Sequence, residues 1–406
     1  AHGAGGDAEA SAKNGQGGAS SLSGGPRRTA SPPRLAAAPG TRNAERVEPD
    51  EPILTEPTPS TALGLTAPTP PLRVGLAGLG RFGGLHASVL ASLPGVELTA
   101  LADPDPQRLR QAGERHGVVR LHADAHSLIA GERLDAVVLA TPDEQHPEQA
   151  RAALELGQHV FVEKPLAHGW RQAEELRQLA TRQGRLLQVG MILRYETSHR
   201  WLHQQIREGH FGELVSIRCQ RNCSRSSYAA IADHVHTVFR TLIHDLDLLL
   251  WLTRSRVTSV TALEVRRGDH LAPLGCFALL RLADGCVAQL ESSWTVPEQA
   301  PANVVSDRWH GCIDAELAVV GTERTAKLRG LQSPLQIWSD QELQQPDTTL
   351  WPELGGQVSG ALREELSDFC RCARAGRPSA IADLDQAVQT MRIAEALIES
   401  ARQGRT

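Results

Sequence analysis

The spacing of hydrophobic residues switches repeatedly between strand-like and helix-like periods from residue 72 to residue 192. Apolar runs at 72–77 and 96–102 predict two short strands, and the apolar residues between them recur at helical spacing until Pro94-Gly95. The alternation then continues with predicted strands at 134–140, 159–162 and 186–192, and predicted helices at 143–156 and 170–183. Strands that alternate with helices predict an α/β fold with a parallel, doubly wound sheet.

The regular alternation of predicted strands and helices ends after about residue 193. The elements predicted there are a helix at 196–208, a strand at 214–220, a helix through 242–252, several strands, and amphipathic helices at 357–376 and 382–404. Two of the strands are joined by Asp284-Gly285, which is typical of a hairpin turn. This pattern predicts an α+β domain with an open, mainly antiparallel sheet, and last helices that pack back on the rest of the body.

We therefore expect two folded domains: a nucleotide-binding Rossmann domain at 71–192 and a substrate-binding and oligomerisation domain at 193–406. Residues 1–70 are rich in Gly, Ala, Ser and Pro and contain no aromatic residue. Such a segment cannot bury enough apolar surface to offset its ordering entropy, so the sequence predicts a disordered leader. A proline-rich arm that docks on a neighbouring subunit is the alternative.

The turn after the first strand carries the strongest motif, Gly78-Leu79-Gly80-Arg81-Phe82-Gly83. In a strand–turn–helix unit, such glycines permit a tight turn, close approach of a pyrophosphate and close packing of the helix on the strand. The N–H groups that open the helix would bind the phosphates. The motif therefore predicts a dinucleotide site.

Asp103 ends the second strand, where an acid accepts hydrogen bonds from the adenosine ribose. Its charge favours NAD, although the nearby Arg108 keeps NADP open. The alternative role for Asp103 is to cap the helix that starts after Pro104.

Lysine is rare here: Lys13, Lys164 and Lys327 are the only lysines among 42 basic residues. Lys164 follows the predicted strand at 159–162, at the end of the strand where α/β proteins bind ligands. A desolvated amine can lose its proton near neutral pH, whereas a guanidinium cannot, so Lys164 is a candidate general base. The alternative is an ordinary surface lysine.

Composition argues against several classes of partner. The net charge of -5 opposes binding to nucleic acid or to a membrane surface, and no apolar run reaches the roughly 18–20 residues of a membrane span. The seven cysteines include no C-x-x-C pair, which favours reduced cysteines in a cytoplasmic protein.

Four motifs occur in a fixed order: the glycine turn, Ala140-Thr141-Pro142 with His146, Glu163-Lys164-Pro165, and Ile243-His244-Asp245-Leu246-Asp247. Together they make the chain resemble the Gfo/Idh/MocA oxidoreductases, and the run 218–224 is most similar to inositol dehydrogenase-like members. The resemblance covers roughly residues 72–404. It implies an NAD(P)-dependent dehydrogenase of sugars, sugar acids or cyclitols that forms homodimers or homotetramers.

The resemblance also implies roles for residues. Lys164 would be the catalytic base, His244 would lie in the substrate pocket and His146 near the nicotinamide ribose. The implied cofactor-binding residues are Gly78, Gly80, Arg81, Phe82, Gly83, Asp103, Thr141, Pro142, His146, Glu163 and Lys164. Glu163 would orient Lys164 or the cofactor, and the Lys164–Pro165 bond would aim the amine if it were cis.

His244 can donate or accept a hydrogen bond at the substrate hydroxyl, with Asp247, one helical turn on, as its orienter. The alternative for His244 is a satisfied core histidine on an apolar helix. His236 and Tyr228 complete the expected substrate-binding set.

One position departs from the family pattern. Members commonly carry an Asp four residues before the helix His, and here that position is Arg240. Arg240 could pair with Asp247 or Glu196, or it could bind a carboxylate or phosphate of the substrate through two hydrogen bonds. The relay would then shorten to Lys164 and His244, or catalysis would be lost.

Arg240 also keeps open a non-catalytic nicotinamide-binding sensor or co-repressor, and a redox-neutral lyase, glycosidase or transhydrogenase with tightly held cofactor is a third option. The set His234, His236, His244 and Asp245 raises the question of a metal. The histidines span a predicted strand and a helix, so the pattern predicts no metal site.

Overall fold

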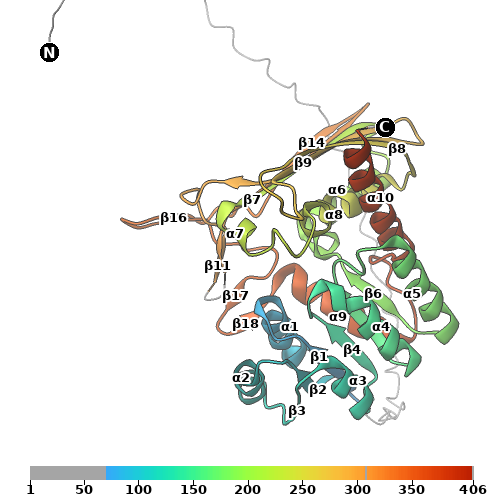
Figure 1. The fold of residues 1–406 in the computed structure, drawn as a ribbon, viewed down its shortest axis with the longest axis vertical. Helices are drawn as coiled ribbons and strands as arrows, with labels where there is room; N and C mark the ends of the chain where they lie inside the picture. The colour runs from blue at the N-terminus through green and yellow to red at the C-terminus, as the bar shows by residue number, and fades with distance from the viewer. Residues whose placement is uncertain (1–69, 307–308, 405–406) are drawn as a thin grey trace, which may run out of the picture. The chain divides into compact units, whose positions relative to one another are not determined.

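The computed structural model describes residues 70–306 and 309–404, without the side chains of Ser306 and Trp309. The leader predicted for residues 1–70, including the alternative docking arm, lies outside the described residues except for residue 70. Two large sheets form the framework (Figure 1). No helix in the described ranges combines the length and the apolar character that crossing a membrane would require.

The first sheet has six strands in the order β3-β2-β1-β4-β5-β6, and every neighbouring pair is parallel. Its strands are β1 (Leu72–Ala77), β2 (Val96–Ala102), β3 (Arg120–His122), β4 (Ala136–Leu139), β5 (His159–Glu163) and β6 (Leu187–Gly190). The helices between them are α1 (Arg81–Ser92), α2 (Pro106–His116), α3 (Ala125–Gly131), α4 (His146–Glu155) and α5 (Trp170–Gln183). The order reverses on the two sides of β1, so the carboxyl ends of β1 and β4 border the crevice where such sheets bind ligands.

The second sheet has the order β14-β13-β7-β10-β9-β8 and is antiparallel except for the pair β7–β10. Its strands are β7 (Leu214–Ser224), β8 (Val257–Val265), β9 (Gly275–Leu282), β10 (Val287–Val296), β13 (Ile313–Gly321) and β14 (Thr325–Gly330). Buried and exposed residues alternate along β9 and along the first part of β10, because one face is covered and the other is open. The predicted α/β plus α+β fold is confirmed, with the hairpin at Asp284-Gly285 between β9 and β10.

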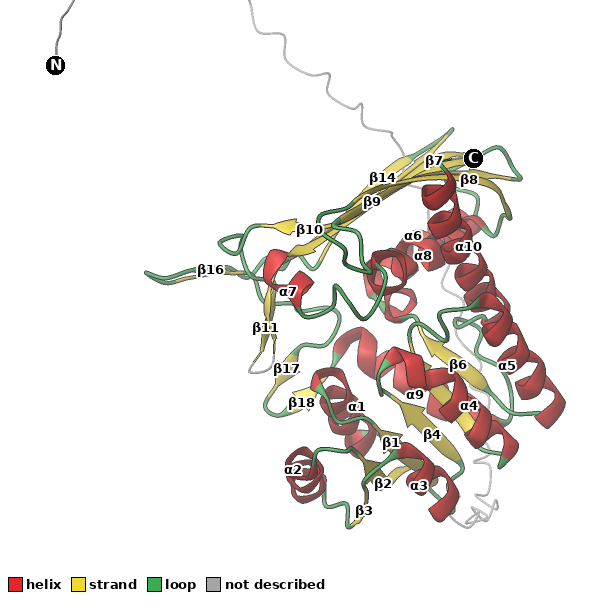
Figure 2. Ribbon diagram, viewed as in Figure 1, coloured by secondary structure: helices red, strands yellow, loops and turns green. Residues whose placement is uncertain are grey.

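Helices cover the inner face of the second sheet (Figure 2). They are α6 (Thr197–Arg207), α8 (Ile243–Thr253) and α10 (Leu384–Gln403). α10 also packs on α5, and α9 (Gly360–Ala375) packs on α1, so the two C-terminal helices return to the first part of the chain. Smaller elements border the site: β11 (Val304–Ser306), β12 (Trp309–Gly311), α7 (Arg225–Ala229), the 3-10 turn η1 (Asp143–Gln145) and the π-helical turn η3 (Val238–Leu242).

Candidate active site

The glycine turn between β1 and α1 has the shape that a dinucleotide requires. Gly78 has φ +88°, and a side chain there would collide with the backbone of Ala140. A side chain at Gly83 would collide with the carbonyl of Gly78, whereas Gly80 faces open space. α1 begins at Arg81 without a side-chain cap, so its first N–H groups face the turn. The residues present therefore fit a pyrophosphate at this helix end.

Two cavities meet at the N-terminus of α1, and Arg81 lines both. One, of about 550 Å³, lies beside α2 and is lined by Leu79, Arg108, Arg115 and His116, among others. The other, of about 570 Å³, contains Lys164, Arg240 and His244. A dinucleotide with its pyrophosphate at α1 would place its adenosine in the first cavity and its nicotinamide in the second.

Asp103 holds the glycine turn in place. Its Oδ2 accepts a hydrogen bond from the N–H of Leu79 at 2.7 Å and its Oδ1 accepts one from the N–H of Asp105 at 2.8 Å. The guanidinium of Arg108 lies 3.8 Å away. The alternative role as a helix cap is wrong, because Asp105 caps α2. The buried carboxylate of Asp103 thus links the end of β2 to the turn.

Lys164 follows β5 directly, and its bond to Pro165 is cis. The Nζ atom lies in the second cavity and donates a hydrogen bond to the carbonyl oxygen of Arg240 at 3.1 Å. Burial and then the charge of Arg240 lower the pKa of Lys164 to about 8, against the opposing charges of Asp143 and Glu163. An amine with this pKa is part neutral near physiological pH, as a general base must be.

His244 opens α8 beside Lys164. Its Nδ1 atom is buried and has no hydrogen-bond partner among the residues described, so the alternative of a satisfied core histidine is wrong. Burial, and then the charges of Lys164, Arg221 and Arg240, hold the pKa of His244 well below its ordinary value. The ring is therefore neutral.

Arg240 lies in the π-helical turn η3 that precedes α8. Within residues 70–306 and 309–404, its guanidinium forms neither a hydrogen bond nor an ion pair, although it lines the cavity. The expected pairing with Asp247 or Glu196 is wrong. Asp247 is bound by Arg194, with contacts of 2.6 and 2.8 Å, and Glu196 pairs with His199 at 2.7 Å.

Asp143 is a site residue that the sequence pattern did not single out. It opens η1 just after β4 and lines the cavity, with its Oδ2 3.8 Å from Nε2 of His168. Burial raises the pKa of Asp143, but His168, Lys164 and Arg240 outweigh burial and lower it, so the group is a carboxylate. An acid two residues beyond Thr141, at the carboxyl end of a strand, is the signal that could have identified it.

Arg221 lines the same cavity from β7. It is buried, and its Nε and Nη2 atoms donate hydrogen bonds to the carboxylate of Asp245, at 2.9 Å each. Its charge is therefore compensated inside the fold.

The remaining residues predicted for the cofactor lie around Lys164. Phe82, Thr141 and Glu163 line the cavity, and Pro142 precedes η1. Glu163 accepts a hydrogen bond from the N–H of Lys164 at 3.2 Å and lies 3.0 Å from the ring of His86. His146 is fully buried, with its ring nitrogens 2.8 Å from the carbonyl oxygen of Pro165 and 3.0 Å from that of Thr141. His146 therefore ties two site loops together.

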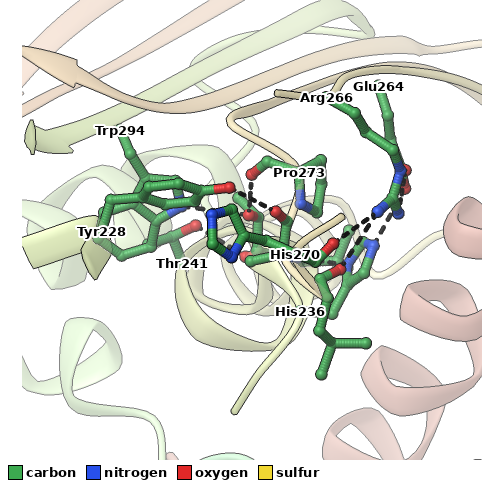
Figure 3. Close-up of polar contacts among 12 residues, drawn as sticks. Tyr228, His236, Thr241, Glu264, Arg266, His270, Pro273 and Trp294 are labelled. Atoms are coloured by element: carbon green, nitrogen blue, oxygen red, sulfur yellow. Dashed lines mark hydrogen bonds and ion pairs between the residues drawn. The ribbon is translucent and has the colours of Figure 1, made fainter. Parts of the chain in front are cut away.

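Three predicted substrate-binding residues have other partners. Tyr228 donates a hydrogen bond to the carbonyl oxygen of Ala272 at 2.8 Å, and His236 lies 3.0 Å from the carboxylate of Glu264 (Figure 3). Asp247 is buried against Arg194. None of the three lines the cavity, so their contacts assign them to the framework around it.

Figure 3 shows how this framework reaches the cavity wall. Trp294, which lines the cavity, donates a hydrogen bond to Thr237 at 3.1 Å, and Thr237 donates one to the carbonyl of Pro273 at 2.6 Å. Glu264, the partner of His236, also binds Arg266. In the described ranges, no group of three or more His, Cys, Asp or Glu residues is arranged to hold a metal ion.

Comparisons with known proteins agree with this geometry. Residues 72–191 match the GFO/IDH/MocA oxidoreductase family, NAD-binding Rossmann fold, and residues 199–327 match the GFO/IDH/MocA C-terminal domain. NAD(+)-dependent scyllo-inositol 2-dehydrogenase of Bacillus subtilis is 24% identical over 340 residues, which are 82% of this chain and 95% of that protein. Inositol 2-dehydrogenase of Acidothermus cellulolyticus is 28% identical over 337 residues, 82% of this chain and 93% of that one.

Solved structures share the fold. Scyllo-inositol dehydrogenase from Lactobacillus casei, crystallised with NAD(H) and scyllo-inositol, aligns with a TM-score of 0.69 and 21% identity over 82% of this chain and 98% of that one. Both domains therefore match one family, in the order in which that family carries them. The chain belongs to the GFO/IDH/MocA oxidoreductases, whose Rossmann domain binds NAD.

Proposed function

We propose that the protein oxidises a secondary alcohol of a sugar or cyclitol, with NAD as the hydride acceptor and Lys164 as the general base. The observation that carries this proposal is that Lys164, whose pKa is lowered to about 8, lines the same cavity as His244, whose Nδ1 atom has no hydrogen-bond partner among the residues described. Arg108, close to Asp103, leaves NADP as the second cofactor to test.

The division of labour follows from the contacts. NAD supplies the hydride acceptor when bound. Lys164 takes the proton from the substrate hydroxyl, since a base must lie within about 2.6–3.2 Å of the group that it deprotonates. His244 is neutral and can donate a hydrogen bond to the same oxygen. Asp143 lowers the cost of a charged Lys164 after proton transfer, because its carboxylate raises the pKa of the amine.

The substrate class rests on the relatives. The two relatives described above are named for inositol, and the aligned Lactobacillus casei structure holds scyllo-inositol. A cavity of about 570 Å³ accommodates a six-carbon polyol beside a nicotinamide.

The test is a panel of polyols and cyclitols incubated with purified protein and NAD, followed through the absorbance of reduced nicotinamide. Lys164→Ala should lower kcat by roughly 10²–10⁴-fold, the usual contribution of a general base. The matched control is Lys327→Ala, because Lys327 is exposed on β14, away from the cavity. Unchanged turnover in Lys164→Ala would contradict the assignment of the base.

A second function is favoured by one observation, the replacement of the usual carboxylate by Arg240. A non-catalytic sensor or co-repressor would bind NAD(H) tightly without turning over any member of the panel, and it would retain a protein partner in a pull-down. A redox-neutral lyase or glycosidase would instead copurify with its cofactor and convert substrate without net NAD reduction.

The open face of the second sheet supports a homodimer or homotetramer. It exposes large apolar side chains on neighbouring strands, among them Leu263, Phe277 and Leu279. A second copy of the chain would bury them. All seven cysteines are free, which supports a reducing compartment such as the cytoplasm, and we expect neither nucleic acid nor a membrane as a partner.

A further inference from the structure

We propose that the substrate is an anion, a polyol that carries a carboxylate, and that Arg240 binds this carboxylate while Lys164 deprotonates a hydroxyl of the same molecule. The inference rests on the proposed function, since it names the substrate class of the same site. Its basis is the side chain of Arg240, a cation without a partner among the residues described. The guanidinium of Arg240 is half-buried, lines the cavity, and makes no hydrogen bond or ion pair within the described parts of the chain.

An unpaired guanidinium in such a place has a cost. A buried charge is disfavoured unless it is paired and hydrogen-bonded, and a carboxylate matches the planar guanidinium with two parallel hydrogen bonds. A carboxylate on the bound ligand would therefore supply the ion-pair partner that the fold does not provide for Arg240. The Asp that the family resemblance implies at this position would instead repel such a ligand, because like charges that face each other in a site are disfavoured.

The other charged side chains that line the cavity have close neighbours of their own or lie at the end of the site where the cofactor is expected. Arg221 is bound by Asp245, and Asp143 faces His168. Glu163 lies against His86. Arg81 stands at the N-terminus of α1, where the pyrophosphate of the cofactor binds.

The position of Arg240 ties the anion to the reacting alcohol. The carbonyl oxygen of Arg240 lies 3.1 Å from Nζ of Lys164, so the backbone that carries the guanidinium passes directly beside the base. Arg240 lines the same cavity as His244, Asp143 and Arg81, and its charge acts on all three. A group bound there belongs to the molecule whose hydroxyl reaches Lys164.

The reaction balances for a hydroxy acid. The carbinol carbon loses a hydride with its electron pair to bound NAD, and its hydroxyl loses a proton to Lys164, so that the alcohol becomes a ketone. The carboxylate takes no part in bond making and keeps its charge. The product is an oxo acid, held by Arg240 through the same contact.

The experiment uses matched probes and the full-length protein. Glucuronate, glucuronamide and glucose share a pyranose ring and differ only in the group at one carbon. That group is anionic in glucuronate and neutral in glucuronamide and glucose, and glucose 6-phosphate carries a phosphate there instead. Turnover with NAD is measured for each, and binding is measured separately by calorimetry on the Lys164→Ala protein saturated with NADH. The variants are Arg240→Met and Arg240→Lys, with Arg281→Met, an exposed arginine on β9, as the control.

The expected result is a preference for glucuronate over glucuronamide of on the order of 30-fold or more, lost in Arg240→Met, since truncating one member of a desolvated charge pair costs 2–5 kcal/mol. Arg240→Lys should restore part of the preference, and Arg281→Met should keep all of it. A preference for glucose 6-phosphate that also depends on Arg240 would show the anion to be a phosphate. That result would overturn the carboxylate and keep the cation site.

Two outcomes separate this inference from the proposed function. Equal turnover of glucuronate and glucuronamide, or of neutral cyclitols in preference to both, overturns the anion and leaves the dehydrogenase intact. If no probe is turned over, the proposed function fails. In that case calorimetry tests the anion by itself. Binding of glucuronate that is weakened by Arg240→Met supports the inference, and binding of equal strength with and without Arg240→Met overturns it.

Discussion

The side-chain amine of Lys164 donates a hydrogen bond to the backbone carbonyl oxygen of Arg240 across a sequence separation of 76 residues. This contact joins the end of β5 in the parallel sheet to the π-helical turn that leads into α8. It sets Lys164 against a residue whose side chain is cationic, and the charge of Arg240 is, after burial, the second cause of the lowered pKa of Lys164.

Removal of the charge at Arg240 should shift the pH dependence of catalysis. After burial, Arg240 is the main cause of the lowered pKa of Lys164, so Arg240→Met should raise that pKa above about 8. Because the neutral amine is the active form, the acidic limb of the kcat/KM profile should move to higher pH. An acidic limb that stays in place would show that Arg240 does not control the base.

Asp143→Asn should have the opposite effect. The carboxylate of Asp143 raises the pKa of Lys164, so its loss should lower that pKa further and move the acidic limb to lower pH. The same pH profile checks the prediction, with Asp340→Asn, an exposed residue between β15 (Ile337–Trp338) and β16 (Leu343–Gln344), as the control. A shift in the same direction as for Arg240→Met would contradict the electrostatic account of the site.

Asp103→Ala should weaken cofactor binding through the glycine turn. The variant leaves the N–H groups of Leu79 and Asp105 without their acceptor, so the turn loses its link to β2. We expect the Kd for NADH, measured by fluorescence titration, to rise by about tenfold or more, which corresponds to roughly 1.4 kcal/mol.

Asp105→Ala is the matched control for that experiment. It removes the cap of α2 and should lower stability while leaving the Kd for NADH near its original value. Equal losses of NADH affinity in both variants would show that the effect comes from α2 and not from the turn.

The pair His236–Glu264 should stabilise the fold in a pH-dependent way. Burial raises the pKa of Glu264, but the contacts with His236 and Arg266 outweigh burial and lower it, so ionised Glu264 contributes stability above its unfolded pKa and loses that contribution as the pH falls through the folded value. Glu264→Gln should lower the free energy of unfolding by about 1–3 kcal/mol at pH 7, and by less near pH 4. Urea unfolding at the two pH values measures this, and a deficit that grows at low pH would refute it.

Leu279→Asp should break the oligomer. Leu279 is 56% exposed on β9, in the middle of the open apolar face, and a charge there cannot be buried against a second copy. Size-exclusion chromatography with light scattering should show a shift to monomer. Leu354→Asp, at a 74% exposed site on β17 (Glu353–Leu354), should leave the mass unchanged. A native Leu279→Asp protein of unchanged mass would place the interface elsewhere.

Local patterns were sufficient for much of the architecture. Period-two and helical spacing predicted most of the strands and helices, because burial of one face imposes its own period on the sequence. They missed the short strand β3 and helix α3, which are three and seven residues long and too short to establish a period. The glycine turn could also be predicted from the sequence, because φ at Gly78 and the close packing at Gly83 admit no side chain.

The sequence failed mainly to predict which partners the polar side chains would have. Asp247 was expected beside His244 and instead binds Arg194, 53 residues away in the sequence. His236 was expected in the pocket and instead lies against Glu264, 28 residues on. Helical spacing tells which residues share a face, but the partner that a charged group meets on another element depends on how the elements pack.

Lys164 shows which properties of a residue the sequence determines and which depend on the tertiary structure. The scarcity of lysine in an arginine-rich chain and the place of Lys164 at the end of a strand single it out from the sequence alone, because strand ends are set by local hydrophobic pattern. The tertiary structure alone decided what surrounds it: the carbonyl and charge of Arg240 on one side and the carboxylates of Asp143 and Glu163 on the other. Acidity depends on burial and on charges brought near by folding, so the sequence could single out Lys164 while only the packed structure set its pKa.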